Sequence, residues 1–163
     1  MNTLVIYYSR TGNTRLVARF AATQLQATEE EIVDQKNRDG VRGFVGGAWD
    51  ALLRRRTEIE PAEQDPADYE LVLVGTPVWA GTMCPAVRRW LTVNSDSLHD
   101  VAFFLTTGGS GRQRTFQEMA QVSGATPHAT LDITVAEIKN EQWRVPTEEF
   151  CEELTAWYQN KRK

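Results

Sequence analysis

Hydroxyl side chains gather around a glycine directly after the first apolar stretch of this sequence. The run from Thr3 to Tyr8 is too short for a typical helix and has the nearly continuous apolar character of a strand covered on both faces. Apolar residues at helical spacing from Leu16 to Leu25 then predict a helix that begins at about Asn13. The loop between them consists of Ser9, Arg10, Thr11, Gly12, Asn13 and Thr14.

This first loop has the chemistry of a phosphate site. Unpaired N–H groups and the positive end of a helix dipole favour an anion at a helix N-terminus. Ser9, Thr11 and Thr14 add hydroxyl donors, and Gly12 lets the backbone approach a ligand with no Cβ in the way. The loop lacks the lysine of a Walker loop, the repeated glycines of a dinucleotide fingerprint and the thiol of a cysteine phosphatase. We therefore infer a phosphate monoester site, with a hydroxyl-rich helix cap that binds nothing as the alternative.

The pattern Ser-x-Thr-Gly-x-Thr after a first strand resembles the flavodoxin family, whose loop of this kind holds the phosphate of FMN. The resemblance continues in a second loop, which follows the apolar run Leu71 to Val74 and precedes a helix opened by Pro85. In flavodoxin-like proteins a Gly-x-Pro-x-Trp-x-Gly loop lies against the flavin ring, and here Trp79 could stack on that ring or instead fill the seam between helix and sheet. The residues implied in flavin contact are Thr76, Pro77, Val78, Trp79, Ala80, Gly81 and Thr82.

A third loop follows the predicted strand from Val101 to Leu105. Its three glycines can bring backbone N–H groups onto the polar edge of a flavin and stabilise the negative charge of the reduced ring. The loop is similar to those of the flavodoxin-like branch that includes quinone and flavin reductases, and it lacks the aromatic residue with which many electron carriers cover the outer flavin face. An open flavin face is therefore expected, although a flexible connector is the alternative for any one such loop. The loop residues are Thr106, Thr107, Gly108, Gly109, Ser110 and Gly111.

The remaining segments complete an alternation of strands and helices. A second strand is expected within Glu31 to Asp34, a helix from Val41 to Leu53, and an edge strand over Leu131 to Val135. The loop from Ala136 to Pro146 contains Trp143, either as a lid or as a core anchor. A final helix carries Phe150, Leu154, Trp157 and Tyr158.

This alternation predicts one α/β domain over residues 1–163, built as a doubly wound five-stranded parallel sheet with helices on both faces. The resemblance implies three α/β/α layers and the flavodoxin-like strand order 2-1-3-4-5, which brings all three loops to the carboxyl ends of the strands. Response regulators share this order, but they need acidic residues where this chain has Ser9-Arg10 and Gly75-Thr76. His99 and His128 precede the last two strands and are expected at the opposite end of the sheet.

Composition limits the function classes. The net charge of −4 arises from acidic and basic residues mixed along the chain, so nucleic-acid binding is not expected. With no leader sequence or apolar stretch of membrane-spanning length, the protein is expected to be cytoplasmic. Cys84 and Cys151 have no zinc-site spacing and should stay reduced, although Cys84 precedes a helix start that could depress the pKa of its thiol.

The resemblance implies an FMN-dependent oxidoreductase or electron-transfer protein, in which the cofactor carries the redox chemistry and no side-chain acid or base is required. Two alternatives stay open: a pure electron shuttle that docks on a partner reductase, and a fold relative that has lost FMN and acts as an interaction module. The electron donor, the acceptor, such as a quinone, and a homodimeric state are also open.

Overall fold

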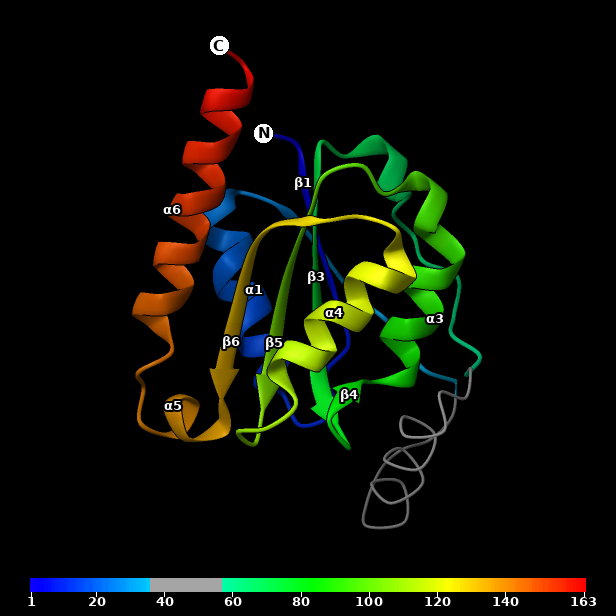
Figure 1. Cartoon of the computed structure of the whole chain (residues 1–163), viewed down its shortest axis with the longest axis vertical. Coiled ribbons are helices and arrows are strands. Elements are labelled where there is room, and N and C mark those ends of the chain that lie inside the picture. The colour runs from blue at the N-terminus through cyan, green and yellow to red at the C-terminus, as the bar shows by residue number, and fades with distance from the viewer. Residues whose placement is uncertain (36–56) are drawn as a thin grey trace.

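The computed structural model describes residues 1–35 and 57–163. Five parallel strands form a sheet in the order β2-β1-β3-β5-β6, and a short strand, β4, pairs antiparallel with β3 (Figure 1). Counted along the chain, the parallel strands have the predicted order 2-1-3-4-5. The strands are β1 (Thr3–Tyr7), β2 (Thr28–Glu31), β3 (Leu71–Trp79), β4 (Thr82–Met83), β5 (Val101–Thr107) and β6 (Pro127–Thr134).

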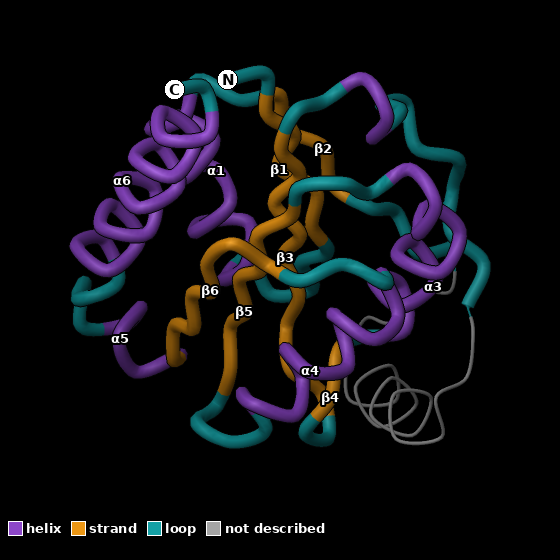
Figure 2. Tube along the Cα trace, turned by 45° about the horizontal axis from the view of Figure 1, so that its top comes forward, coloured by secondary structure: helices purple, strands orange, loops and turns teal. Residues whose placement is uncertain are grey.

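Helices cover both faces of the sheet, as predicted (Figure 2). Helices α1 and α6 pack on one face, and α3 and α4 pack on the other. The helices are α1 (Asn13–Leu25), α3 (Pro85–Asn94), α4 (Arg112–Ser123), α5 (Val135–Lys139) and α6 (Arg144–Lys161), with short 3₁₀ turns at Pro66–Asp68 and Ser95–Ser97. The helix expected from Val41 to Leu53 lies outside the described residues.

Alternation along the strands divides the core into two layers. Leu4 and Ile6 of β1 join the cluster beneath α3 and α4, whereas Val5 and Tyr7 join the cluster beneath α1 and α6. Side chains of successive strand residues point to opposite faces, so a strand that is apolar throughout can fill both layers. This explains why the apolar runs of the sequence located β1, β3 and β5.

The second strand lies earlier in the chain than the sequence pattern predicts. Strand β2 ends at Glu31, where the prediction began, and its four residues are Thr28 and three glutamates. It is an edge strand whose carboxylates are held by neighbours, because Tyr7 Oη donates to Glu29 at 2.6 Å and Arg15 forms two bonds to Glu31 at 2.6 and 2.8 Å. Apolar Ile32, which suggested the strand, follows it and is buried against the sheet.

Further segments differ from the sequence expectation. Strand β5 runs to Thr107, two residues into the predicted third loop, and β6 begins at Pro127, before the predicted start at Leu131. Strand β3 continues through the predicted second loop as far as Trp79, because Thr76 and Pro77 stay in register with Leu105 and Thr106 of β5. The stretch expected as a loop around Trp143 contains α5 and the approach to α6. The sequence pattern predicts that the edge strand includes Val135. Helix α5 begins there instead, because Thr134 and Glu137 form a capping box.

Trp143 is a core anchor, one of the two alternatives left open. It is 3% exposed, and its ring meets the Phe20 ring edge-on at 5.3 Å. The Arg144 guanidinium lies 4.7 Å from the centroid of the Trp143 ring. Across residues 1–35 and 57–163, no helix combines the length and apolar character needed to cross a bilayer.

Close packing between β3 and β5 gives a prediction on stability. Gly75 pairs with Phe104, and a Cβ at position 75 would overlap the Phe104 ring. We expect Gly75→Ala to lower the free energy of unfolding by about 1–3 kcal/mol, because the fully buried ring would have to shift within a close-packed core. Chemical denaturation measures this loss.

A matched control for that experiment is Gly108→Ala. A Cβ at position 108 meets no atom of the described residues within 4 Å, and the free energy of unfolding should change by less than about 0.5 kcal/mol. Equal stabilities of the Gly75→Ala variant and the wild-type protein would show that the contact with Phe104 does not constrain the sheet.

Candidate functional site

The three predicted loops follow β1, β3 and β5, which are adjacent strands of the parallel sheet. Their carboxyl ends therefore meet at one edge, as expected from the sequence. Direct contacts join the loops to one another. The Thr14 and Thr106 hydroxyls are 2.8 Å apart, the Tyr8 N–H donates to the Gly75 carbonyl at 3.2 Å, and a Cβ at Gly111 would lie 2.6 Å from Gly81 Cα.

The first loop leaves the N-terminus of α1 without a side-chain cap. Gly12 is the N-cap residue with φ of 91°, and as a glycine it has no side chain that could accept a hydrogen bond from the first turn. The Ser9 hydroxyl instead accepts from the Gly12 N–H at 3.2 Å and so shapes the loop. Because the first N–H groups of a helix have no intrahelical partner, this end of α1 can take an anion.

The hydroxyls of the first loop have different environments. Thr11 is exposed, whereas Thr14 is 1% exposed and shares its hydrogen bond with Thr106. Two hydroxyl groups that pair use one hydrogen between them, which leaves the other hydrogen for a further acceptor. Thr11 can therefore reach a ligand directly, and Thr14 also ties the first loop to the third.

The second loop is a tight hairpin between β3 and β4. Ala80 and Gly81 form its turn with φ of 49° and 76°, the pair of positive values that is typical of a type I′ turn. Gly81 is here the usual residue for such a conformation, and Ala80 adopts it despite its Cβ. The turn thus presents backbone rather than long side chains at the edge of the sheet.

Trp79 lies at the base of this hairpin and is 8% exposed. The Tyr8 ring meets it edge-on at 5.7 Å, and the Arg10 guanidinium lies 5.9 Å from its centroid. It belongs to the core cluster beneath α3 and α4. So little exposed surface favours the interpretation that Trp79 fills the seam between helix and sheet over a role as a stacking platform.

The third loop has internal hydrogen bonds of its own. The Thr107 hydroxyl donates to the Ser110 carbonyl at 2.9 Å and accepts from the Gly109 N–H at 3.1 Å. Gly108, Gly109 and Ser110 are exposed, while Thr106 and Thr107 are buried. These bonds argue against a flexible connector, and they commit the Gly109 N–H to the loop itself.

Neither Cys84 nor His128 has the environment of a reactive group at this edge of the sheet. Cys84 is fully buried, and burial raises the pKa of its thiol to about 11, so the thiol is protonated at neutral pH. Its position before α3 does not produce the low pKa that a reactive cysteine requires. His128 lies near the start of β6, where Nε2 is 2.7 Å from Asp100 Oδ1, at the end of the sheet remote from the loops.

Sequence analysis missed two charged residues beside the hairpin. Arg88 of α3 and Glu118 of α4 are 6% and 5% exposed, and Arg88 Nη2 lies 3.1 Å from Glu118 Oε2. The Thr82 hydroxyl contacts both of them. Each charge lies in an ordinary amphipathic helix, so only the packing of the two helices reveals that the charges face inward.

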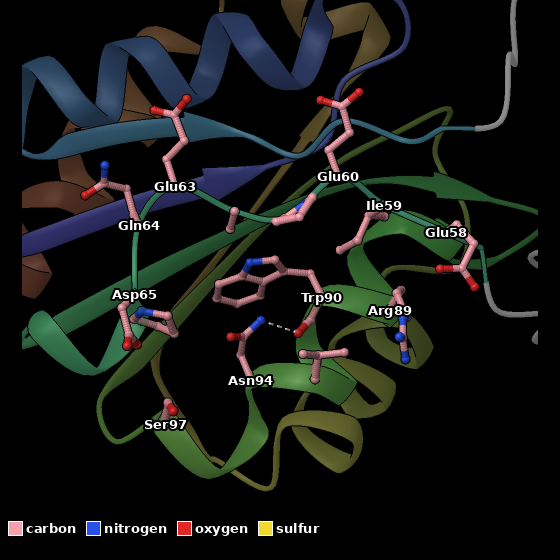
Figure 3. A pocket seen from close by; sticks show the side chains of 14 residues that line it. Glu58, Ile59, Glu60, Glu63, Gln64, Asp65, Arg89, Trp90, Asn94 and Ser97 are labelled. Carbon is pink, nitrogen blue, oxygen red and sulfur yellow. Dashed lines mark hydrogen bonds between the residues drawn. The ribbon is translucent and has the colours of Figure 1, made fainter.

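A separate cavity of about 520 Å³ lies between residues 58–66 and the second half of α3 (Figure 3). Among the described residues, its lining includes the acidic Glu58, Glu60, Glu63 and Asp65 and one cation, Arg89. Four carboxylates would repel a phosphate dianion. The cavity therefore does not fit the phosphate monoester that the first loop predicts, and the uncapped end of α1 does.

Comparison with known proteins identifies the fold. No family model and no curated protein matches the chain, but solved structures do. A flavoprotein in complex with FMN from Lactobacillus acidophilus aligns with a TM-score of 0.71 at 20% identity, over 87% of this chain and 97% of that one. Oxidised flavodoxin 1 from Bacillus cereus aligns with a TM-score of 0.58 at 15% identity, over 96% and 98% of the two chains. Two-electron reduced flavodoxin from Megasphaera elsdenii gives 0.59 at 16% identity, over 91% and 97%. The chain thus has the flavodoxin-like fold.

Proposed function

We propose that this protein binds FMN at the edge formed by the loops after β1, β3 and β5 and acts as a flavin-dependent redox protein. The observation that carries the proposal is the uncapped N-terminus of α1, surrounded by the hydroxyls of Ser9, Thr11 and Thr14. The alignment with a flavoprotein in complex with FMN supports the choice of ligand.

The first loop would hold the phosphate. Amides of the first turn of α1 and the Thr11 hydroxyl are donors, and a phosphate has only acceptors to offer them. Gly12 suits this place because its φ of 91° turns the chain into the helix, and a Cβ there would meet no described atom within 4 Å. The described residues therefore leave room for a ligand beside Gly12.

The other two loops would hold the ring. The Ala80–Gly81 turn and the Gly108–Ser110 segment lie beside one another at the same edge, since Gly111 contacts Gly81. FMN, when bound, supplies the electron transfer. The chain supplies binding and orientation, with backbone groups near the polar edge of the ring.

We also propose that a small substrate can reach the flavin. Gly108, Gly109 and Ser110 are exposed and carry no bulky side chain that would cover the ring. This favours an oxidoreductase that uses a nicotinamide donor and a quinone-type acceptor over a shuttle that exchanges electrons only with a docked protein. The shuttle remains the second candidate, because a carrier needs only an exposed ring edge.

The phosphate assignment predicts a specific loss in Thr11→Val. The variant should bind FMN about tenfold more weakly, because one hydrogen bond to a charged acceptor is lost, and should bind riboflavin as the wild-type protein does. Titration with each flavin, followed by fluorescence, measures both dissociation constants.

The control is Thr23→Val, at the far end of α1, where an exposed hydroxyl donates to the Arg19 carbonyl. It should bind both flavins normally. Equal weakening of FMN and riboflavin by Thr11→Val would remove the phosphate from the first loop.

The open face predicts turnover with small molecules. The FMN-loaded protein should oxidise NADH or NADPH with a quinone as acceptor, and Gly108→Trp should abolish this turnover by covering the ring. Position 108 suits the test because a Cβ there meets none of the described part of the chain within 4 Å and the backbone is not in the left-handed region. Loss of absorbance of the nucleotide measures the rate.

Gly108→Ser is the matched control and should retain turnover. Reduction of the bound flavin by dithionite should be unaffected in both variants. Absence of turnover with either nucleotide, together with reduction by a partner reductase, would favour the shuttle.

A further inference from the structure

Three buried polar side chains meet behind the hairpin that the proposed flavin ring would contact. Thr82 of β4, Arg88 of α3 and Glu118 of α4 are 2%, 6% and 5% exposed. Arg88 Nη2 lies 3.1 Å from Glu118 Oε2 and donates to Thr82 Oγ1 at 3.0 Å. The Thr82 hydroxyl in turn donates to the same Glu118 oxygen, so one carboxylate oxygen joins all three elements.

A buried ion pair is a poor device for stability alone. Removing two charges from water costs several kcal/mol per ion, and well-packed apolar residues in their place are often as stabilising or more so. What the pair provides is a defined relative orientation of α3 and α4, because a guanidinium and a carboxylate bind each other well only in certain geometries. Its value here therefore depends on what it holds in place.

Helix α4 contacts the hairpin at two points. Glu118 reaches β4 through Thr82, and Gly111, the N-cap residue of α4, lies against the turn, where a Cβ would come within 2.6 Å of Gly81 Cα. The Thr115 hydroxyl donates to the Gly111 carbonyl at 2.7 Å and fixes the first turn of the helix between these points. A shift of α4 relative to β4 would therefore change the spacing between the second and third loops.

We propose that the Arg88–Glu118 ion pair and the Thr82 hydroxyl are positioning groups that set the spacing between the Ala80–Gly81 turn and the Gly108–Gly111 loop. The inference rests on the proposed function, in which these two loops hold the flavin ring. The three side chains are buried behind the hairpin and act through its backbone. They are not assigned to the first loop, which would hold the phosphate.

Because Thr82, Arg88 and Glu118 act on the second and third loops, replacing them should affect flavin binding differently from replacing residues of the first loop. Thr82→Val and Glu118→Gln should weaken FMN and riboflavin by the same factor, about tenfold, because both flavins carry the ring and only one carries the phosphate. The midpoint potential of the bound flavin should also become more negative, since misplaced N–H groups stabilise the reduced ring less well. Thr147→Val is the matched control, because Thr147 is equally buried but its hydroxyl donates to the Trp143 carbonyl on the other face.

The decisive measurement needs no flavin. Hydrogen exchange on the flavin-free chain should show faster exchange of amides 80–82 and 108–111 together in Thr82→Val and in Glu118→Gln, and no change in Thr147→Val. Unchanged exchange in either loop of these two variants would overturn the proposal. If the wild-type protein binds no flavin, the proposed function fails, and this measurement still decides whether the three side chains couple the loops.

A double replacement distinguishes positioning from simple stability. Glu118→Gln leaves Arg88 as a buried, unpaired charge and should lower the unfolding midpoint. Arg88→Met with Glu118→Leu removes both charges and should return the midpoint to that of the wild-type protein or higher. We expect hydrogen exchange in the two loops to remain fast, because apolar side chains pack without fixing the orientation of α4 relative to β4. Recovery of wild-type exchange along with stability would overturn the positioning role.

Discussion

Parallel pairing of β1, β3 and β5 is the constraint on which the rest of the structure depends. Parallel neighbours must place their carboxyl ends at the same edge, so three loops that lie far apart in the sequence meet there. The pairing continues along β3 beyond its apolar run, where Thr76 and Pro77 remain in register with β5. That extension carries the hairpin turn outward until Gly81 reaches Gly111, and it thereby completes the site.

The loops contribute differently to this edge. The first offers an uncapped helix N-terminus and hydroxyls, which suit a phosphate, whereas the second and third offer backbone in conformations that glycine permits. Thr14 and Thr106 couple the first loop to the third, and Thr82, Arg88 and Glu118 hold the second against α4. Titratable side chains such as Cys84 and His128 are buried or remote, which fits a site whose reactivity comes from a bound cofactor.

The sequence predicted the structure correctly wherever a pattern depended on a single strand or helix. Apolar runs located β1, β3 and β5, and the glycines and hydroxyls that follow them located the first loop and the turns at Ala80–Gly81 and Gly108–Gly111, although β3 and β5 extend into the predicted second and third loops. It was insufficient where neighbours decide the outcome: acidic β2 is a strand because Tyr7 and Arg15 bind its carboxylates, and Trp143 is core because α1 brings Phe20 against it. The inward-facing charges of Arg88 and Glu118 likewise follow from the contact between two helices, which no local periodicity reports.

We propose that this edge of the sheet binds FMN through its phosphate as well as its ring. Calorimetric titration of the flavin-free wild-type protein with FMN, and separately with riboflavin, tests it most directly. The proposed site predicts one FMN per chain, bound more tightly than riboflavin by a factor that reflects the donors of the first loop. Failure to bind either flavin, or equal affinity for both, would contradict it.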